Sequence, residues 1–319
     1  MDLNVRKNIL EKQGYRIVGN HSAIKICHYC KTAIRGSDKC YKNRFYGIDS
    51  SRCIQTSLTL DVCNLRCEWC WRDINYISFS KIFSDEPEKI LKDLVEEQKK
   101  ILVGFYGNKK ASKKNIDKAM KPMHIALSLS GDACMYSKLP ELIDLIRKNG
   151  MTSFVVTNGT FPEMIKKLIN HQPTQLYITL PAPDENTFLK VCRPSNKNLW
   201  KNIMCSLKLL KHFKRGTIRL TLYNGINMMN PEGYSNILKN AGFKFLEIKS
   251  AMPIGYAQYR LKYADMPTHK EIKDFASKIA RLNRLKMIDE KENSRVVLLM
   301  KKDAKDRIMK FNQTCKSLL

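Results

Sequence analysis

The sequence predicts an α/β fold built on a parallel sheet. After residue 70, short runs rich in β-branched residues alternate with longer amphipathic stretches, which is typical of repeated strand–helix units. Polar or glycine-bearing turns follow several of the runs, and in a barrel-like parallel sheet such turns open on the face where ligands bind. The expected strands are Gln55–Leu60, His124–Ser130, Thr152–Thr157, Gln175–Leu180, Thr217–Leu222 and Phe245–Lys249.

Helices are expected between these strands, and residues suited to helix ends support their positions. Ser84 suits the N-cap of the first helix, and Gly150 and Gly242 follow the ends of two others. A short strand at Arg295–Met300 and a basic tail are expected near the end of the chain. The expected helices are Asp85–Val103, Leu139–Lys148, Phe161–Asn170, Lys197–Lys214, Pro231–Asn240 and Thr268–Leu285.

The composition is that of a strongly basic globular protein. The 319 residues include 57 Lys or Arg and 30 Asp or Glu, so the formal charge is +27. Because this excess repels itself, a polyanionic partner is expected. Nucleic acid is favoured over an anionic membrane surface, since no stretch sets basic residues against a wide apolar stripe. Without a membrane span or the apolar core of a signal peptide, a cytoplasmic protein is expected, with no membrane partner.

Val103–Lys121 is a lysine-rich insertion between the first helix and the second strand. Its lysines are candidates for binding phosphates of a nucleic acid. The alternative is a solvated loop without such contacts. The candidate residues are Lys109, Lys110, Lys113 and Lys114.

The cysteines are concentrated near the start of the chain. Their total of 11 is odd and no export signal precedes them, which favours metal binding over a disulfide framework. Four isolated ones, Cys134, Cys192, Cys205 and Cys315, are expected to be small core residues. The other seven are Cys27, Cys30, Cys40, Cys53, Cys63, Cys67 and Cys70.

Cys63, Cys67 and Cys70 follow a predicted strand with the spacing C-x3-C-x2-C. A tight loop of this length can turn three thiolates toward one metal centre. On a cubane iron–sulfur cluster, three thiolates leave one iron without a protein ligand, and chemistry can occur there. The alternative is a zinc site with Cys53 as the fourth ligand.

With Trp69 before the last cysteine, this motif resembles the cluster loop of the radical S-adenosylmethionine (radical SAM) superfamily. The resemblance implies a partial (β/α)6 TIM-like barrel with S-adenosyl-L-methionine bound to a 4Fe–4S cluster. It implies that Trp69 lies by the adenine. Turn capping is the alternative role for the polar residues at the strand ends. The other implied cofactor contacts are Ser130, Gly131 and Asp132, in the place of a Gly-Gly-Glu turn, with Thr157, Asn158 and Asn224.

Upstream of the loop, Cys27, Cys40 and Cys53 form a C-x12-C-x12-C array. Together with the segments YKNRFYGIDSSRC, DVCNLRCEWCWRD and ALSLSGD, this array resembles the tRNA 4-demethylwyosine synthase family in its archaeal, single-domain form. The resemblance implies a second 4Fe–4S cluster on the array, pyruvate as co-substrate, and N1-methylguanosine beside the anticodon of phenylalanine tRNA as substrate. A zinc site that also uses Cys30 is the alternative for the array.

Lys42 follows Cys40 by two residues, and the family resemblance implies that a lysine here holds pyruvate as a Schiff base. Its alternatives are a surface lysine or a contact to RNA phosphate. An external electron donor and a monomeric protein are also expected. The expected organisation is a cluster-binding extension at residues 1–54, a barrel at 55–260 and a helical, basic extension at 261–319.

Two other functions stay open at this point. A radical SAM enzyme could act on another substrate, in sulfur insertion or peptide maturation. A zinc-stabilised RNA-binding protein would use the cysteines and the basic surface without catalysis.

Overall fold

The computed structural model describes residues 3–76 and 85–311. Contacts divide the chain into two compact units, each described by itself below. Unit 1 comprises residues 1–60, 81–155 and 308–319, and unit 2 comprises residues 61–80 and 156–307. The division predicted at residues 54 and 260 stays a prediction. No helix among the described residues has the length and apolar character needed to cross a membrane.

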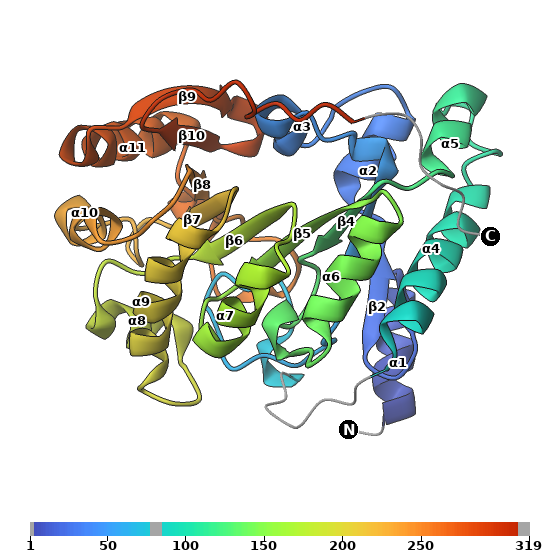
Figure 1. Cartoon of the computed structure of the whole chain (residues 1–319), viewed down its shortest axis with the longest axis horizontal. Coiled ribbons are helices and arrows are strands. Elements are labelled where there is room, and N and C mark those ends of the chain that lie inside the picture. The colour runs from blue at the N-terminus through green and yellow to red at the C-terminus, as the bar shows by residue number, and fades with distance from the viewer. Residues whose placement is uncertain (1–2, 77–84, 312–319) are drawn as a thin grey trace. The chain divides into compact units, whose positions relative to one another are not determined.

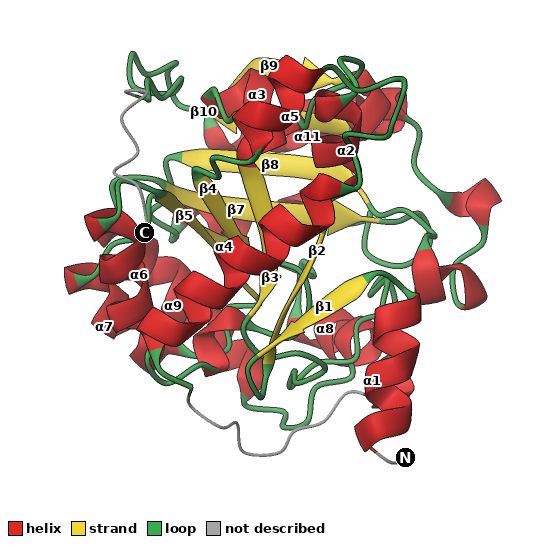
Figure 2. Cartoon of the chain, turned by 90° about the vertical axis from the view of Figure 1, so that its right-hand side faces the viewer, coloured by secondary structure: helices red, strands yellow, loops and turns green. Residues whose placement is uncertain are grey.

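Unit 1 contains strands in the order β1-β2-β3-β4-β5. Its first two pairings are antiparallel, and β3, β4 and β5 are parallel. The long helix α4 packs across β1, β2 and β3 (Figure 2). The strands are β1 (Tyr15–Val18), β2 (Ser22–Lys25), β3 (Cys53–Ser57), β4 (His124–Leu127) and β5 (Thr152–Thr157), and the helices are α1 (Leu3–Lys12), α2 (His28–Ile34), α3 (Tyr41–Tyr46), α4 (Pro87–Val103), α5 (Lys113–Ala119) and α6 (Leu139–Lys148).

Unit 2 contains strands in the order β6-β7-β8-β10-β9. The first three are parallel, and β10 runs antiparallel to both of its neighbours. Helix α11 packs against β8, β10 and α10 (Figure 1). The strands are β6 (Gln175–Thr179), β7 (Gly216–Leu222), β8 (Phe245–Ser250), β9 (Lys286–Lys291) and β10 (Val296–Met300), and the helices are α7 (Pro162–Asn170), α8 (Glu185–Cys192), α9 (Leu199–Leu209), α10 (Pro231–Lys239) and α11 (His269–Asn283).

The predicted α/β class is confirmed, because all six predicted strands are present as β3 to β8. The short strand predicted near residue 296 is β10. The strand order begins with β1 and ends with β9, and these two strands are not paired, so the sheet does not close on itself. The helix predicted at Lys197–Lys214 is shorter, because Gln172 donates to the His212 carbonyl at 2.8 Å and accepts from the Lys214 N–H at 3.1 Å. These bonds take the chain out of the helix.

The prediction that Cys205 is a core residue is wrong. Its side chain is exposed on α9, whereas Ile203 and Leu207 are buried. Residues two positions apart in a helix point in widely different directions, so a cysteine between two core positions faces solvent. Cys134 and Cys192 are buried, as predicted, and Cys315 lies outside the described residues.

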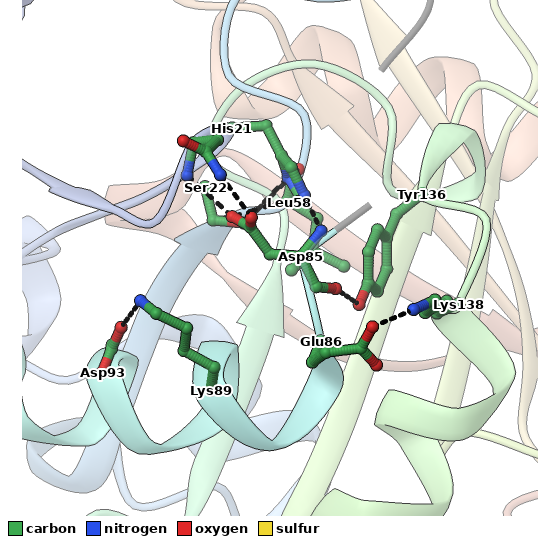
Figure 3. Close-up of polar contacts among 10 residues, drawn as sticks. His21, Ser22, Leu58, Asp85, Glu86, Lys89, Asp93, Tyr136 and Lys138 are labelled. Carbon is green, nitrogen blue, oxygen red and sulfur yellow. Dashed lines mark hydrogen bonds and ion pairs between the residues drawn. The ribbon is translucent and has the colours of Figure 1, made fainter. Parts of the chain in front are cut away.

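The start of α4 is fixed by contacts of Asp85 (Figure 3). Its N–H donates to His21 Nε2 at 3.0 Å, so Nδ1 of this ring carries the proton and donates to the Leu58 carbonyl at 2.6 Å. Its carbonyl accepts from the Tyr136 hydroxyl at 2.7 Å. With the Asp85 backbone used in this way, the helix begins at Pro87 rather than at the predicted residue 85. The predicted N-cap, Ser84, lies outside the described residues.

A buried ion pair joins β7 to β8 inside unit 2. Arg219 donates from Nε and Nη2 to Glu247 Oε2 at 3.0 and 2.9 Å. The Glu247 side chain is fully buried, and the Arg219 side chain is 14% exposed. The guanidinium carbon lies 4.5 Å from the centre of the Tyr177 ring, which adds a cation–π contact. Because the Glu247 carboxylate is buried, its negative charge is tolerated only while the Arg219 guanidinium compensates it.

Replacing Arg219 by Met is expected to lower the free energy of unfolding by about 3–5 kcal/mol, because the Glu247 carboxylate loses its compensating charge while it stays buried. Urea titration at neutral pH measures this loss, and the double variant R219M/E247L is expected to recover most of it. Lys166→Met, which breaks an exposed pair with Glu163, is the matched control and should change little. Equal effects of the two single variants would contradict the argument.

Candidate active site

The Cys63–Cys70 loop lies in unit 2 and is irregular in structure. Its Arg66 N–H donates to the Cys192 carbonyl at 2.8 Å. Its Glu68 N–H donates to the Val191 carbonyl, one residue earlier in α8, at 2.9 Å. These two bonds run like a short ladder between the loop and the end of α8. The loop backbone is therefore positioned by a neighbouring element rather than by regular structure of its own.

Arg260 holds the loop from another segment of unit 2. Its Nε donates to the Glu68 carbonyl at 3.1 Å, and its Nη2 donates to the Cys70 carbonyl. Close by, Gly255 has a φ of +55°, and a Cβ atom there would lie 2.4 Å from the Trp71 carbonyl oxygen. Only glycine allows the two backbones to approach so closely. The cysteine loop and residues 255–260 thus pack directly against each other.

Asn158, predicted as a site residue, lies beside the first cysteine of the loop. Its Nδ2 donates to Asn64 Oδ1 at 2.9 Å and lies 3.8 Å from Cys63 Sγ. Asn64 in turn donates to the Thr160 hydroxyl at 2.8 Å. The side chain of Asn158 accepts from the Thr160 N–H at 3.0 Å, so its amide orientation is fixed. The structure therefore brings the end of β5 and the cysteine loop together through a chain of amides.

The remaining predicted residues of unit 2 make structural contacts. Thr157 is buried, and its hydroxyl accepts from the Gly159 N–H at 3.1 Å, which caps the turn after β5. Asn224 donates to Glu271 Oε1 at 3.2 Å at the start of α11. Trp69 is half-buried against an apolar cluster of unit 2. These contacts fix the positions of the side chains, and their roles toward a cofactor stay predictions.

Two of the three loop thiols, those of Cys67 and Cys70, favour the protonated form. A hydrogen bond with the Cys192 thiol and burial raise the pKa of Cys67 well above its ordinary value. Burial raises the pKa of Cys70 as well, although the neighbouring Arg72 acts in the opposite direction. Because a metal centre is bound by thiolates, binding at this loop must displace these protons.

Among the residues that the structure describes, no three Cys, His or carboxylate side chains converge closely enough to hold a single metal ion. A cubane cluster places each cysteine ligand on a different iron atom, so its ligands stand farther apart than those of one ion. Three thiols from one loop, each able to bind its own iron, therefore suit a cluster with one open iron. This donor set fits the group that the sequence predicts.

The Ser130–Asp132 turn belongs to unit 1 and is tightly built. The Ser57 hydroxyl donates to the Ser130 carbonyl at 2.6 Å, and Gly131 has a φ of +69°. The Asp132 carboxylate is buried and accepts from the Cys134 N–H at 2.9 Å. This carboxylate thus caps the turn that follows β4. A contact from Asp132 to the amino group of a cofactor stays a prediction.

The upstream cysteines lie in unit 1. Cys27 and Cys40 immediately precede α2 and α3, and Cys53 is the first residue of β3. Burial raises the pKa of Cys53 well above its ordinary value, and Cys27, Cys30 and Cys40 all lie near enough to raise it further. Cys30, by contrast, points its thiol at the Ser51 carbonyl, 3.5 Å away. The fold therefore gathers all four upstream cysteines, and Cys30 differs from the other three in its contact with the Ser51 carbonyl.

Lys42 lies next to this group of cysteines. Its positive charge lowers the pKa of Cys53 and so partly offsets the effect of burial. Its Nζ lies 5.4 Å from the centre of the Phe154 ring. His124 is also near, and burial together with the charges of Arg52 and Lys42 lowers the pKa of this histidine to about 3. The amine of Lys42 therefore lies near an aromatic ring and a histidine that stays neutral. Lys42 itself is half-buried.

Three residues of this site were not among the predicted ones: Asn64, Cys192 and Arg260. Asn64 stands inside the cysteine motif, where its position next to Cys63 was the available signal. Cys192 is buried in the core, as predicted. Its contact with Cys67 arises from the tertiary fold and could not be predicted from the sequence. Arg260 is 190 residues from Cys70, and nothing local in the sequence indicates their contact.

Two family models match the chain. One, described as the radical SAM superfamily, matches residues 58–234, which include the cysteine loop. The other, described as wyosine base formation, matches residues 241–301. The second match includes residues 255–260, which contact the loop.

Similar proteins carry one name. The S-adenosyl-L-methionine-dependent tRNA 4-demethylwyosine synthase of Pyrococcus abyssi is 39% identical over 302 residues, which cover 93% of this chain and 88% of that protein. The enzyme of the same name from Methanocaldococcus jannaschii is 38% identical over 306 residues, covering 93% and 96%.

Solved structures agree with these relatives. A structure of TYW1 with a lysine–pyruvate adduct bound is 35% identical, with a TM-score of 0.87 and coverage of 97% of this chain and 99% of that one. A crystal structure of archaeal TYW1 is 34% identical with a TM-score of 0.77, covering 94% and 96%. The chain therefore belongs to the tRNA 4-demethylwyosine synthase family of radical SAM enzymes.

Proposed function

We propose that this chain condenses N1-methylguanosine, next to the anticodon of phenylalanine tRNA, with pyruvate to form 4-demethylwyosine. The observation that carries the proposal is the C-x3-C-x2-C loop in a fold shared, at a TM-score of 0.87, with a structure that holds a lysine–pyruvate adduct. Relatives named for this reaction are similar along nearly the whole chain, which supports the same conclusion.

Cys63, Cys67 and Cys70 would hold one 4Fe–4S cluster. When bound, the cluster binds S-adenosyl-L-methionine and supplies the electron that cleaves it to a 5′-deoxyadenosyl radical. The chain's own part is to position the loop, through α8 and Arg260, and to keep water away. The residues proposed to contact the cofactor are Trp69, Ser130, Gly131, Asp132, Thr157, Asn158 and Asn224.

We further propose a second 4Fe–4S cluster on Cys27, Cys40 and Cys53, with Lys42 binding pyruvate beside it. Cys27 and Cys40 lie near enough to Cys53 to raise its pKa, which supports the grouping, and Cys30 raises it as well. Cys30 is left out because its thiol points at the Ser51 carbonyl. Anaerobic reconstitution tests the number of clusters: about eight irons and eight sulfides per chain are expected, and about four of each for Cys40→Ala. Bound zinc without visible absorption would contradict both clusters.

The tRNA is proposed to contact the lysine-rich insertion through its phosphates. This segment is not an open loop, because it contains α5. Its candidate lysines are exposed and form no ion pair within the described residues. By contrast, Lys118 of the same helix is paired with Asp49 at 2.7 Å.

Replacing Lys109 and Lys110 by Ala is expected to weaken binding of any tRNA to a similar extent, because phosphates carry no sequence information. The slope of log affinity against log salt should fall by about 0.7 to 0.9 for each lost contact. Fluorescence anisotropy at several salt concentrations measures both effects. Lys148→Ala, an exposed lysine of α6 in the same unit, is the control. An unchanged salt slope would instead favour a solvated segment.

Mass spectrometry of nucleosides tests the function. The reduced protein is incubated with S-adenosyl-L-methionine, pyruvate and tRNA that contains N1-methylguanosine, and 4-demethylwyosine is expected only when all are present. Pyruvate is omitted in one reaction and replaced by a sulfide source in another. Product without pyruvate would contradict the proposal.

The proposed enzyme is a monomer in the cytoplasm that receives its electron from an external donor.

A further inference from the structure

The segment after β8, residues 252–265, exposes large side chains that a soluble protein usually buries. We call it the rim segment. Tyr259 and Tyr263 are 77% and 73% exposed, and Ile254 and Met252 are 53% and 41% exposed. Contiguous exposure of this kind marks an interaction site more often than chance.

The other side of the rim segment is firmly anchored in unit 2. Ala257 and Leu261 are buried in an apolar cluster to which Trp69 of the cysteine loop also packs. The Tyr256 N–H donates to the Trp71 carbonyl at 2.9 Å. Together with the bonds of Arg260 to the loop carbonyls, these contacts fix the segment directly on the cysteine loop. The exposed rings therefore stand on an ordered base beside the loop.

The chemistry of the exposed side suits unpaired RNA. The exposed side of the rim segment carries Lys262 and Asp265, in a chain of formal charge +27, whereas the Arg260 side chain is turned toward the cysteine loop. Aromatic rings next to cationic side chains are the usual platform for unpaired bases, because every base has a face on which a ring can stack. The formal charge of the whole chain, +27, favours a polyanion such as RNA as the partner.

We propose that Tyr259 and Tyr263 are stacking platforms for unpaired bases of the tRNA anticodon loop. They hold the loop at the cysteine loop while the target nucleotide leaves the stack, which a base-modifying enzyme requires. This inference rests on the proposed function, because it takes tRNA as the substrate. It adds the surface that receives the loop and the residues that do so.

Binding of an anticodon stem–loop RNA to the reconstituted protein tests the proposal. Tyr259→Ala and Tyr263→Ala are each expected to raise the Kd by about 5- to 140-fold, the range of one lost stack. Tyr259→Phe and Tyr263→Phe keep the ring and should bind as the unchanged protein does. Leu282→Ala, an exposed apolar residue of α11 in the same unit, is the matched control and should also bind normally. A duplex RNA without a loop should show no difference among these proteins.

Two further measurements separate the alternatives. With dithionite as reductant and no tRNA, the alanine variants should form 5′-deoxyadenosine at the rate of the unchanged protein. Loss of this activity would mean that the tyrosines only support the cysteine loop, and would overturn the proposal. The alanine variants could instead bind RNA normally and turn over slowly only when a protein supplies the electrons. That result would assign the surface to the electron-donor protein and would also overturn the proposal.

The proposed function can fail separately. If the unchanged protein makes 4-demethylwyosine while the alanine variants bind the stem–loop normally, the platform is wrong and the function stands. If the unchanged protein neither binds this tRNA nor modifies it, both proposals are wrong.

Discussion

Replacing Cys63, Cys67 or Cys70 by Ala is expected to abolish formation of 5′-deoxyadenosine, because each substitution removes a thiolate from the cluster that would bind S-adenosyl-L-methionine. Cys40→Ala, which alters the second proposed cluster, is expected to retain cleavage of the cofactor while 4-demethylwyosine is lost. Chromatography of anaerobic reactions with dithionite, pyruvate and tRNA measures both products at once. The contrast between the two products separates the two sets of cysteines.

Cys205→Ala is the matched control, since this exposed cysteine of α9 lies in the same unit as the loop. It should leave both products unchanged. Iron content must be measured for every variant, so that a misfolded protein is recognised. If Cys40→Ala lost cofactor cleavage while keeping the cluster on the Cys63–Cys70 loop, the division of roles between the two sets would be wrong.

Lys42→Met is expected to eliminate 4-demethylwyosine while 5′-deoxyadenosine still forms, because the amine that would join pyruvate is gone. The amine must be neutral to attack the ketone. Lys42 is half-buried, with its Nζ near the Phe154 ring and His124. Borohydride reduction with labelled pyruvate should place the label on the peptide that contains Lys42. Product formation and peptide mass spectrometry give two independent measurements.

Lys148→Met removes an exposed lysine from the same unit and is expected to change neither product nor labelling. Full product formation by Lys42→Met would rule out an essential Schiff base at this residue. Labelling at other lysines with equal yield would mean that borohydride trapped nonspecific imines.

The sequence predicted the strands well because hydrophobic periodicity is a local property. Thr152–Thr157 and Leu139–Lys148 have the predicted bounds. The first two predicted strands end earlier than expected, since the N–H groups of Ser128 and Leu129 both donate to the Thr56 carbonyl and take the chain out of the ladder. Such a departure depends on a partner strand that local pattern does not identify.

The candidate site shows the same limit. The spacing of Cys63, Cys67 and Cys70 identified the loop, since three thiols must come from a short segment to meet one cluster. The residues that hold the loop come from elsewhere in the chain, and Arg260 and the end of α8 could not be assigned to it from pattern alone. The position of the cysteine loop could therefore be predicted from the sequence, whereas the residues that support the loop could not, and cluster binding by its cysteines stays a prediction.

The contacts of Arg260 also set an order of events during synthesis. The two carbonyls that it binds belong to residues 68 and 70, so the cysteine loop emerges from the ribosome some 190 residues before its clamp. At about 5–20 residues per second, that delay is roughly 10–40 seconds. The nascent loop cannot reach its final backbone geometry in this interval. For the proposed cluster, we therefore expect the final geometry of its cysteine ligands to form only after translation has passed residue 260.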